Sequence, residues 1–156
     1  MLSFIVRPYE PADFDILYAI DRACYPRGIA YSRRTLRSYL SPANADCLVA
    51  QAKPRSGGEI MGFIIAVAEG CEAHIITIDV AEPHRRSGVG TALLRAMEER
   101  LALRGTRRIA LETATSNEAG VAFWQRHGYR LAGVLRGYYL GRIDAYWMLK
   151  TLGETN

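Results

Sequence analysis

The segment that most constrains the fold of this chain covers residues 75–104. An apolar run, residues 75–80, is followed by a short loop, and the loop opens into a stretch with apolar residues at helical spacing. The loop contains two arginines and two glycines: Arg85, Arg86, Gly88 and Gly90. A strand, a glycine-containing loop and an amphipathic helix in this order are typical of an α/β domain.

The same loop predicts a site for an anion. Unpaired N–H groups and the dipole at the start of a helix favour a phosphate group, and guanidinium groups bind one through charge-assisted hydrogen bonds. Glycine lets the backbone approach a ligand closely and take a positive φ. We therefore expect a diphosphate to be bound by the loop and the start of the helix, through Arg85, Arg86, Ser87, Gly88, Val89, Gly90 and Thr91.

Two common phosphate-binding loops fit this segment poorly. A P-loop requires Gly-Lys-Ser/Thr, whereas Gly90 is followed directly by Thr91. A dinucleotide-binding turn requires a third small residue, and that position holds Leu93. Glu112 does lie about twenty residues further on, where an acid would bind a ribose, so a dinucleotide-binding oxidoreductase fragment stays open as a rival.

A third pattern, Arg/Gln-x-x-Gly-x-Gly/Ala, is present as Arg85-x-x-Gly88-x-Gly90, and here the sequence resembles the GNAT superfamily of acetyl-CoA-dependent N-acetyltransferases. The resemblance covers nearly the whole chain, because four further segments follow the family's order: residues 5–8, 59–64, 111–117 and 123–129. The ending Tyr138-Tyr139, followed by residues 144–148, is similar to that of ribosomal-protein and N-terminal protein acetyltransferases.

The resemblance implies an α/β fold with one domain over residues 1–156. It implies a mixed sheet of roughly six to seven strands, about four flanking helices, and a parallel strand pair that splays apart. The hydrophobic pattern agrees with this outline. It predicts strands at 4–7, 47–52, 60–68, 73–80, 108–113, 129–135 and 145–149, and helices at 11–24, 32–40, 91–104 and 118–127.

Composition narrows the classes of partner and location. Hydrophobic residues make up 49% of the 156-residue chain, which is enough for one packed domain. No apolar run approaches the ~20 residues that span a bilayer, and the start lacks the basic region of a signal peptide, so no membrane is expected. The net charge of +4 is dispersed, which argues against nucleic acid. Three scattered cysteines, Cys24, Cys47 and Cys71, match neither a metal site nor a disulfide framework and suggest a reducing cytoplasm. The expected assembly is a monomer or a homodimer.

The resemblance implies that acetyl-CoA is the cofactor and that its pantetheine arm lies between the splayed strands. Backbone groups of Ile78, Asp79 and Val80 would then pair with the arm, and one N–H would face the thioester oxygen. Such a donor stabilises a transition state by ~3 kcal/mol. The family counterpart of Asn117 bonds the cofactor arm, although asparagine is also a good cap for the helix that follows it.

Glu112 is the leading candidate for the base that takes the proton of the acceptor amine. It interrupts an apolar strand and lies where ribosomal-protein acetyltransferases have a proton-accepting glutamate. Asp79 and His74 on the preceding strand are the second choices. A carboxylate in this position can also relay the proton through water.

The acid end of the site departs from the family. Many relatives carry a tyrosine seven residues after the asparagine, but this chain has Trp124, and an indole N–H does not deliver a proton as a phenol does. Two alternatives follow: the thiol, with a pKa of ~8.5, leaves as thiolate without an acid, or Tyr139 or Tyr138 takes that role. Tyr25, Tyr31 and Tyr138 are expected to bind the acceptor.

These features together predict transfer of an acetyl group from acetyl-CoA to a primary amine by direct attack on the thioester. The N-terminal α-amine of a protein or peptide is the leading acceptor. A small-molecule amine acetyltransferase and a CoA-binding sensor without turnover are the alternatives, and Trp124 is the residue that keeps the sensor open.

Overall fold

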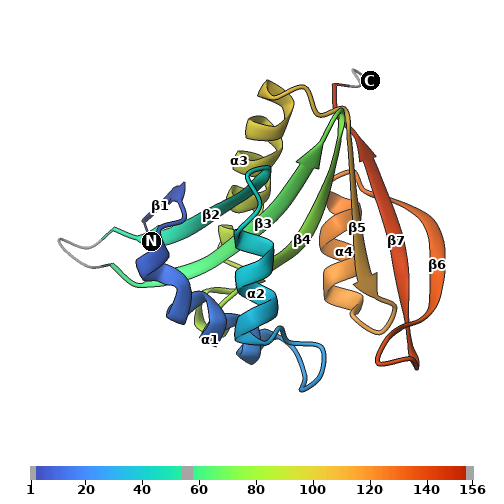
Figure 1. Ribbon diagram of the computed structural model, residues 1–156, viewed down its shortest axis with the longest axis horizontal. Coiled ribbons are helices and arrows are strands. Elements are labelled where there is room, and N and C mark those ends of the chain that lie inside the picture. The colour runs from blue at the N-terminus through green and yellow to red at the C-terminus, as the bar shows by residue number, and fades with distance from the viewer. Residues whose placement is uncertain (1–2, 54–57, 154–156) are drawn as a thin grey trace.

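The chain folds around one mixed seven-stranded sheet with helices on both of its faces (Figure 1). The computed structural model describes residues 3–53 and 58–153, so most of the loop expected between the predicted strands at 47–52 and 60–68 lies outside the described residues. The strands are β1 (Phe4–Pro8), β2 (Ala45–Ala52), β3 (Ile60–Glu69), β4 (Glu72–Val80), β5 (Arg108–Ala114), β6 (Arg130–Tyr139) and β7 (Ile143–Thr151). The helices are α1 (Phe14–Cys24), α2 (Arg33–Leu40), α3 (Val89–Leu103) and α4 (Glu118–Arg126), with short 3-10 turns at Pro11–Asp13 and Glu82–His84.

The predicted strands and helices are confirmed in number and order, and several of their ends differ. The first helix is divided into the turn Pro11–Asp13 and α1. Helix α3 begins at Val89, two residues early, because Gly88 at φ 86° already takes the N-cap position. Strand β6 continues to Tyr139, because the chain reverses through Leu140 and Gly141, which both have positive φ.

The sheet has the order β1-β2-β3-β4-β5-β7-β6, and β4 with β5 is its parallel pair. This pair is short: residues 72–74 of β4 are in register with residues 108–110 of β5. Beyond these residues the two strands separate, and Figure 1 shows them diverging from a common end. The predicted splayed pair is therefore confirmed.

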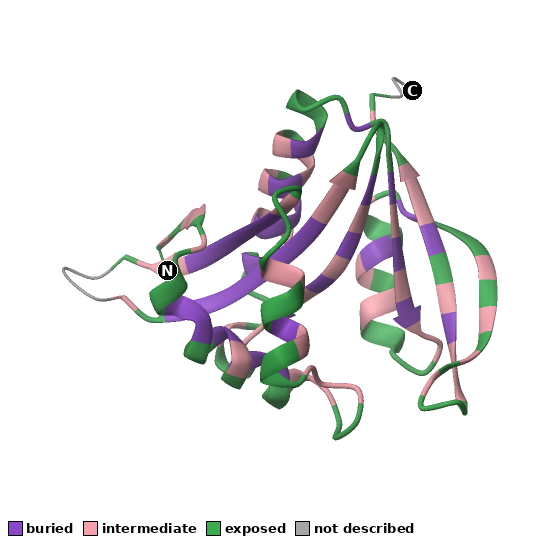
Figure 2. Cartoon of the chain, viewed as in Figure 1, coloured by how far each residue is buried: buried purple, intermediate pink, exposed green. Residues whose placement is uncertain are grey.

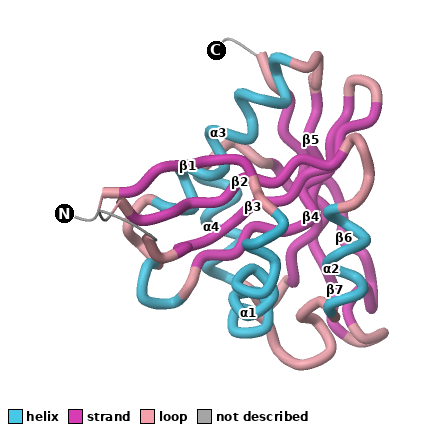
Figure 3. The backbone as a smooth tube through the Cα atoms, turned by 60° about the vertical axis from the view of Figure 1, so that its left-hand side comes forward, coloured by secondary structure: helices cyan, strands magenta, loops and turns pink. Residues whose placement is uncertain are grey.

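Two apolar clusters hold the helices to opposite faces of the sheet. Helix α3 contributes Leu93, Leu94, Met97 and Leu101 to the larger cluster, which also contains Trp124 of α4. The smaller cluster joins Phe14 and Leu17 of α1 and Leu36 of α2 to β2 and β3. Strand residues alternate between the two clusters, as the pleat of a sheet requires. The buried residues accordingly form a continuous band through β2 and β3 in Figure 2, and Figure 3 shows the helices on either side.

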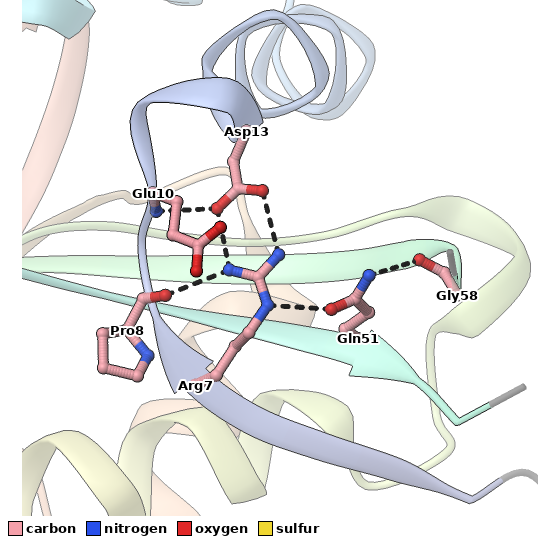
Figure 4. Close-up of polar contacts among 6 residues, drawn as sticks. All are labelled: Arg7, Pro8, Glu10, Asp13, Gln51 and Gly58. Carbon is pink, nitrogen blue, oxygen red and sulfur yellow. Dashed lines mark hydrogen bonds and ion pairs between the residues drawn. The ribbon is translucent and has the colours of Figure 1, made fainter. Parts of the chain in front are cut away.

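A buried polar cluster connects β1 to the start of α1 (Figure 4). Arg7 donates from both terminal nitrogens to Asp13, at 2.8 and 2.9 Å, and from Nε to Gln51 at 2.8 Å. Asp13 also accepts the backbone N–H of Glu10 at 2.8 Å. The hydrogen-bonded guanidinium of Arg7 lowers the pKa of Asp13, and the carboxylate of Asp13 raises the pKa of Arg7. These contacts fix the position from which α1 begins.

Within residues 3–53 and 58–153, no helix is long and apolar enough to cross a lipid bilayer.

Candidate active site

Strand β4 changes direction at a β-bulge just beyond its pairing with β5. Ile65 of β3 pairs with Thr77 and Ala66 pairs with Ile75, so Ile76 is an extra residue in β4. Ile76 packs against the cluster of α1 and α2, and Thr77 also faces α1 because its hydroxyl bonds Asp79 there. Ile78 and Val80 then face the opposite cluster. The bulge therefore re-aims the backbone of β4 along the part that borders the gap.

His74 and Glu112 meet across the gap at the point where β4 and β5 separate. The Nε2 atom of His74 lies 2.5 Å from Oε2 of Glu112. Their side chains are 41% and 19% exposed, so both groups remain within reach of a substrate. His74 is in register with Ala110, the last residue of β5 that pairs with β4. Glu112 lies two residues further along β5, on the same face of the sheet.

A small open pocket adjoins this pair. Four tyrosines and one apolar residue complete its lining around His74 and Glu112: Tyr31, Tyr39, Ile76, Tyr138 and Tyr139. The rings of Tyr138 and Tyr139 lie edge to face, with centroids 4.8 Å apart. Burial raises the pKa of Tyr139 to about 12, so its hydroxyl keeps its proton at neutral pH. The pocket thus holds one acid–base pair and several neutral hydroxyl donors.

The loop before α3 forms a concave set of backbone N–H groups. Arg86 and Gly88 both have positive φ, at 61° and 86°, and such alternation of backbone conformation directs successive N–H groups toward one point. The first α3 residue whose N–H bonds back to the loop is Ala92, which donates to Gly88 at 3.0 Å. The preceding N–H groups are those that a helix leaves without an intrahelical acceptor. An added Cβ on Gly88 would meet no atom within 4 Å, so the space beside Gly88 is open.

Two side chains of the loop brace it instead of extending from it. Arg85 donates from Nε to the carbonyl of Val80 at 3.1 Å, and its Nη2 lies 3.5 Å from Sγ of Cys24. Ser87 donates its hydroxyl to the carbonyl of His84. Arg85 therefore connects the loop to β4 and α1, and both Arg85 and Arg86 are exposed cations of the loop.

Helix α4 lies beside the start of α3. The side chain of Asn117 accepts the N–H of Gly120 at 3.0 Å and caps α4. A Cβ on Gly120 would lie 2.5 Å from Nδ2 of Asn117, so glycine is needed where the cap folds over the helix. Thr91 and His127 lie within hydrogen-bonding distance, at 3.1 Å, and connect the two helices.

Trp124 belongs to the core and not to the pocket. It is 6% exposed, and its ring lies edge to face with Phe123 and Tyr129, at 5.1 and 5.2 Å between centroids. Its side chain therefore packs between α4 and the sheet.

The structure brings Glu112, Tyr31, Tyr138 and Tyr139 together at one pocket and separates two other predicted residues from it. Tyr25 lies behind β4, where its hydroxyl is 3.4 Å from that of Thr77. The side chain of Asp79 is 1% exposed and faces α1, so only its backbone borders the gap. Sequence reasoning missed Tyr39, Ile76 and the bulge, and ranked His74 below Glu112 without foreseeing their contact.

Comparison with known proteins agrees with this geometry. Residues 14–129 match the acetyltransferase (GNAT) family. The chain belongs to this family. The N-alpha-acetyltransferase of Sulfurisphaera tokodaii is 28% identical over 163 residues, which cover 96% of this chain and 94% of that protein.

Two solved structures of similar proteins share the fold of this GNAT chain. The ribosomal-protein-S18-alanine N-acetyltransferase from Escherichia coli superposes with a TM-score of 0.84 at 25% identity, over 99% of this chain and 97% of that one. Ard1 from Thermoplasma volcanium superposes with a TM-score of 0.86 at 25% identity, over 97% of this chain and 99% of that one. The activity of the chain is therefore acetyl-CoA-dependent N-acetyl transfer.

The residues present fit acetyl-CoA as the acetyl donor of a GNAT enzyme. The concave N–H groups around Gly88 are open and suit a diphosphate. Beyond His74, the edge of β4 that faces β5 has no strand paired to it within the described residues, and it suits an extended arm with amide groups.

Proposed function

We propose that the chain acetylates the N-terminal α-amine of a protein or peptide, and that residues 1–156 act as one N-acetyltransferase domain. The observation that carries this proposal is the His74–Glu112 pair at the tyrosine-lined pocket, placed where β4 and β5 separate. The names of the relatives support the acceptor, because they include an N-alpha-acetyltransferase and a ribosomal-protein-alanine N-acetyltransferase.

On the donor side, the chain binds acetyl-CoA through backbone groups. The N–H groups from Arg86 to Thr91 and the side chain of Arg86 hold the diphosphate, while Arg85 keeps the loop in place. The backbone of Ile78, Asp79 and Val80 pairs with the extended arm. When bound, acetyl-CoA supplies an activated thioester carbonyl, and a backbone N–H of β4 facing its oxygen stabilises the negative charge that develops there. Asn117 offers its Nδ2 amide to the arm while its oxygen caps α4.

On the acceptor side, Glu112 and His74 remove the proton of the incoming amine. An α-amine, with a pKa of ~7.7–8.0, costs about 1 kcal/mol to neutralise at pH 7, whereas a lysine amine at ~10.4 costs about 4–5 kcal/mol. One carboxylate paired with one imidazole suits the removal of a proton from an α-amine, which costs less. Tyr31 and Tyr138 line the path of the acceptor chain, and Tyr25 supports them from behind β4.

Tyr139 is the proposed source of a proton for the departing thiolate. Its phenol is protonated at neutral pH and lines the same pocket as Glu112. The demand on it is small, because a thiol of pKa ~8.5 leaves as thiolate at a cost of about 2 kcal/mol at pH 7. The enzyme can therefore turn over although Trp124, a core residue, stands where many relatives have a tyrosine.

We further propose that the enzyme works in the cytoplasm as a monomer or homodimer, without a nucleic-acid or membrane partner. Its three cysteines are free thiols, which suits a reducing compartment.

The test is acetylation of a peptide panel with the purified protein. Free thiol is measured as it is released from acetyl-CoA, and mass spectrometry locates the acetyl group. We expect peptides with a free α-amine to react, and the same peptides with a blocked α-amine and a free lysine to remain unmodified. Faster acetylation of free amino acids or polyamines would contradict the proposed acceptor, and binding without thiol release would indicate a sensor.

A further inference from the structure

Two carboxyl groups are buried together behind the acceptor pocket. Asp21 on α1 is 0% exposed and Asp79 on β4 is 1% exposed, and their side chains contact each other. One oxygen of each has a donor: Asp21 accepts the N–H of Tyr31 at 2.7 Å, and Asp79 accepts the hydroxyl of Thr77 at 2.6 Å. The other two oxygens, Oδ1 of Asp21 and Oδ2 of Asp79, have no donor among the described residues.

The surroundings do not neutralise two negative charges. Cys24 and Tyr25 face the pair from α1 and the residue after it, and Tyr31 faces it from the loop before α2. Arg85, in the loop before α3, is a cation near Cys24, but its guanidinium is directed to the Val80 carbonyl and the Cys24 sulfur. Two adjacent carboxylates that are removed from water cannot both stay ionised. A single proton removes the repulsion and gives both unpartnered oxygens a hydrogen bond.

We propose that Asp21 and Asp79 share one proton, and that this carboxylic acid–carboxylate bond fixes the acceptor-binding loop to β4. Either oxygen carries the proton and donates it to the other, so the pair holds one negative charge. Asp21 accepts a hydrogen bond from the N–H of Tyr31. The hydroxyl of Tyr31 lies 3.4 Å from the carbonyl of Ile76, the bulge residue. Tyr31 lines the acceptor pocket. Asp21 and Asp79 are thus positioning residues for the acceptor.

Burial, reinforced by the Asp21 carboxyl, holds the pKa of Asp79 well above its usual range. A raised pKa in the folded state means that the stabilising proton is fully bound below the unfolded pKa and is lost as the pH rises through the folded value. Between those two values the folded chain keeps one proton that the unfolded chain releases. The unfolding equilibrium constant therefore rises tenfold per pH unit from this proton.

The first test compares denaturant unfolding of the wild type, Asp79→Asn and Asp21→Asn from pH 5 to pH 8. Each variant keeps the hydrogen bond through a carboxamide N–H but holds no shared proton. We expect the unfolding constant of the wild type to rise by about tenfold per pH unit relative to either variant. Asp13→Asn is the control, because the pKa of Asp13 is lowered by Arg7 and its effect is constant in this range. Parallel curves for all four proteins would overturn the proposal.

A second measurement needs no variant. Carbon-13 NMR of the aspartate carboxyl groups reports their ionisation directly, and we expect one protonated aspartyl carboxyl at pH 7. A spectrum in which every aspartate titrates below pH 5 would overturn the shared proton.

The positioning role rests on the proposed function and has its own readout. As the pH passes the point at which the wild type loses the shared proton, KM for the acceptor should rise while KM for acetyl-CoA stays constant. In Asp79→Asn the acceptor KM should stay flat. An acceptor KM that follows the same pH profile in both proteins would overturn the positioning role. If the unfolding constant shows the expected pH dependence but no amine is acetylated, the proposed function is wrong and the shared proton is still supported.

Discussion

Glu112 and His74 come from two strands that are neighbours at one end and separate at the other. Each residue alone would be a polar side chain at the end of a strand. The 2.5 Å contact between them makes one acid–base group at the boundary between the donor gap and the acceptor pocket. In the proposed mechanism, a base at this boundary lies where the amine meets the thioester, because reacting groups must be held within about 3–3.5 Å.

Glu112→Gln should lower kcat by a factor of about 10²–10⁴, the range for loss of a general base, with KM for acetyl-CoA unchanged. His74→Gln should have a smaller effect in the same direction, because the carboxylate remains. The measurement is steady-state thiol release with a saturating peptide. Glu69→Gln, at the exposed end of β3, is the control. A kcat of wild-type size in Glu112→Gln would remove Glu112 from the mechanism.

The two roles of Asn117, capping α4 and the proposed binding of the cofactor, depend on different atoms of its side chain. Its oxygen caps α4, and its Nδ2 is the group offered to acetyl-CoA. Asn117→Asp keeps the capping oxygen and loses the donor, so we expect an unchanged thermal midpoint and a KM for acetyl-CoA raised by about tenfold, the value of roughly one hydrogen bond. Asn117→Ala should in addition cost about 1 kcal/mol of stability. If Asn117→Asp binds acetyl-CoA as well as the wild type does, Asn117 caps α4 and has no role in cofactor binding.

At the scale of elements, the proposed diphosphate site depends on the backbone shape of the loop before α3. Gly88 is the N-cap of α3 and has a positive φ, and Arg86, two residues earlier, has a positive φ without being glycine. A non-glycine residue in that region persists when the surroundings require it, and it is often associated with a functional site.

Gly88→Ala tests this loop, and Gly105→Ala is its matched control. Both glycines have positive φ, 86° and 94°, and open space where a Cβ would go. Both substitutions should therefore lower the free energy of unfolding by about 1–2 kcal/mol. Gly88→Ala should also weaken CoA binding by at least tenfold in calorimetry, while Gly105→Ala should bind normally. Equal binding by the two variants would place the diphosphate elsewhere.

The sequence predicted those features that depend on local pattern. The predicted helices at 32–40 and 91–104 are examples, because Ser32 caps α2 by accepting the N–H of Thr35 and Gly105 follows the end of α3. The bulge could not be predicted, because Ile76 and Thr77 are both β-branched and fit any regular strand. The contacts of His74 with Glu112 and of Asp21 with Asp79 depend on the register between strands and on helix placement. Those distances are set by tertiary packing, which no short-range pattern contains.

At the scale of the whole molecule, the proposed acceptor and donor sites pack on different apolar clusters. The loop that holds Tyr31 and helix α1 pack on the smaller cluster, and α3 with the loop before it packs on the larger one. The sheet joins the two, so the position of α1 on the sheet decides the geometry of the acceptor side. Arg7 and Asp13 hold the start of α1 to β1 (Figure 4).

Asp13→Ala should lower the free energy of unfolding by about 2–3 kcal/mol at pH 7, because it leaves the guanidinium of Arg7, whose side chain is 19% exposed, without its charge partner. The pKa of Asp13 is lowered in the folded state, so its stabilisation is fully present above the unfolded pKa of ~4 and is lost as the pH falls through the folded value. The difference in stability between wild type and variant should therefore be constant from pH 5 to pH 8 and shrink below pH 4. Denaturant unfolding at each pH measures it. Asp15→Ala, which removes an exposed partner of Arg33, should leave stability nearly unchanged at every pH. A difference that persists undiminished at pH 2 would mean that Asp13 acts through packing and not through its charge.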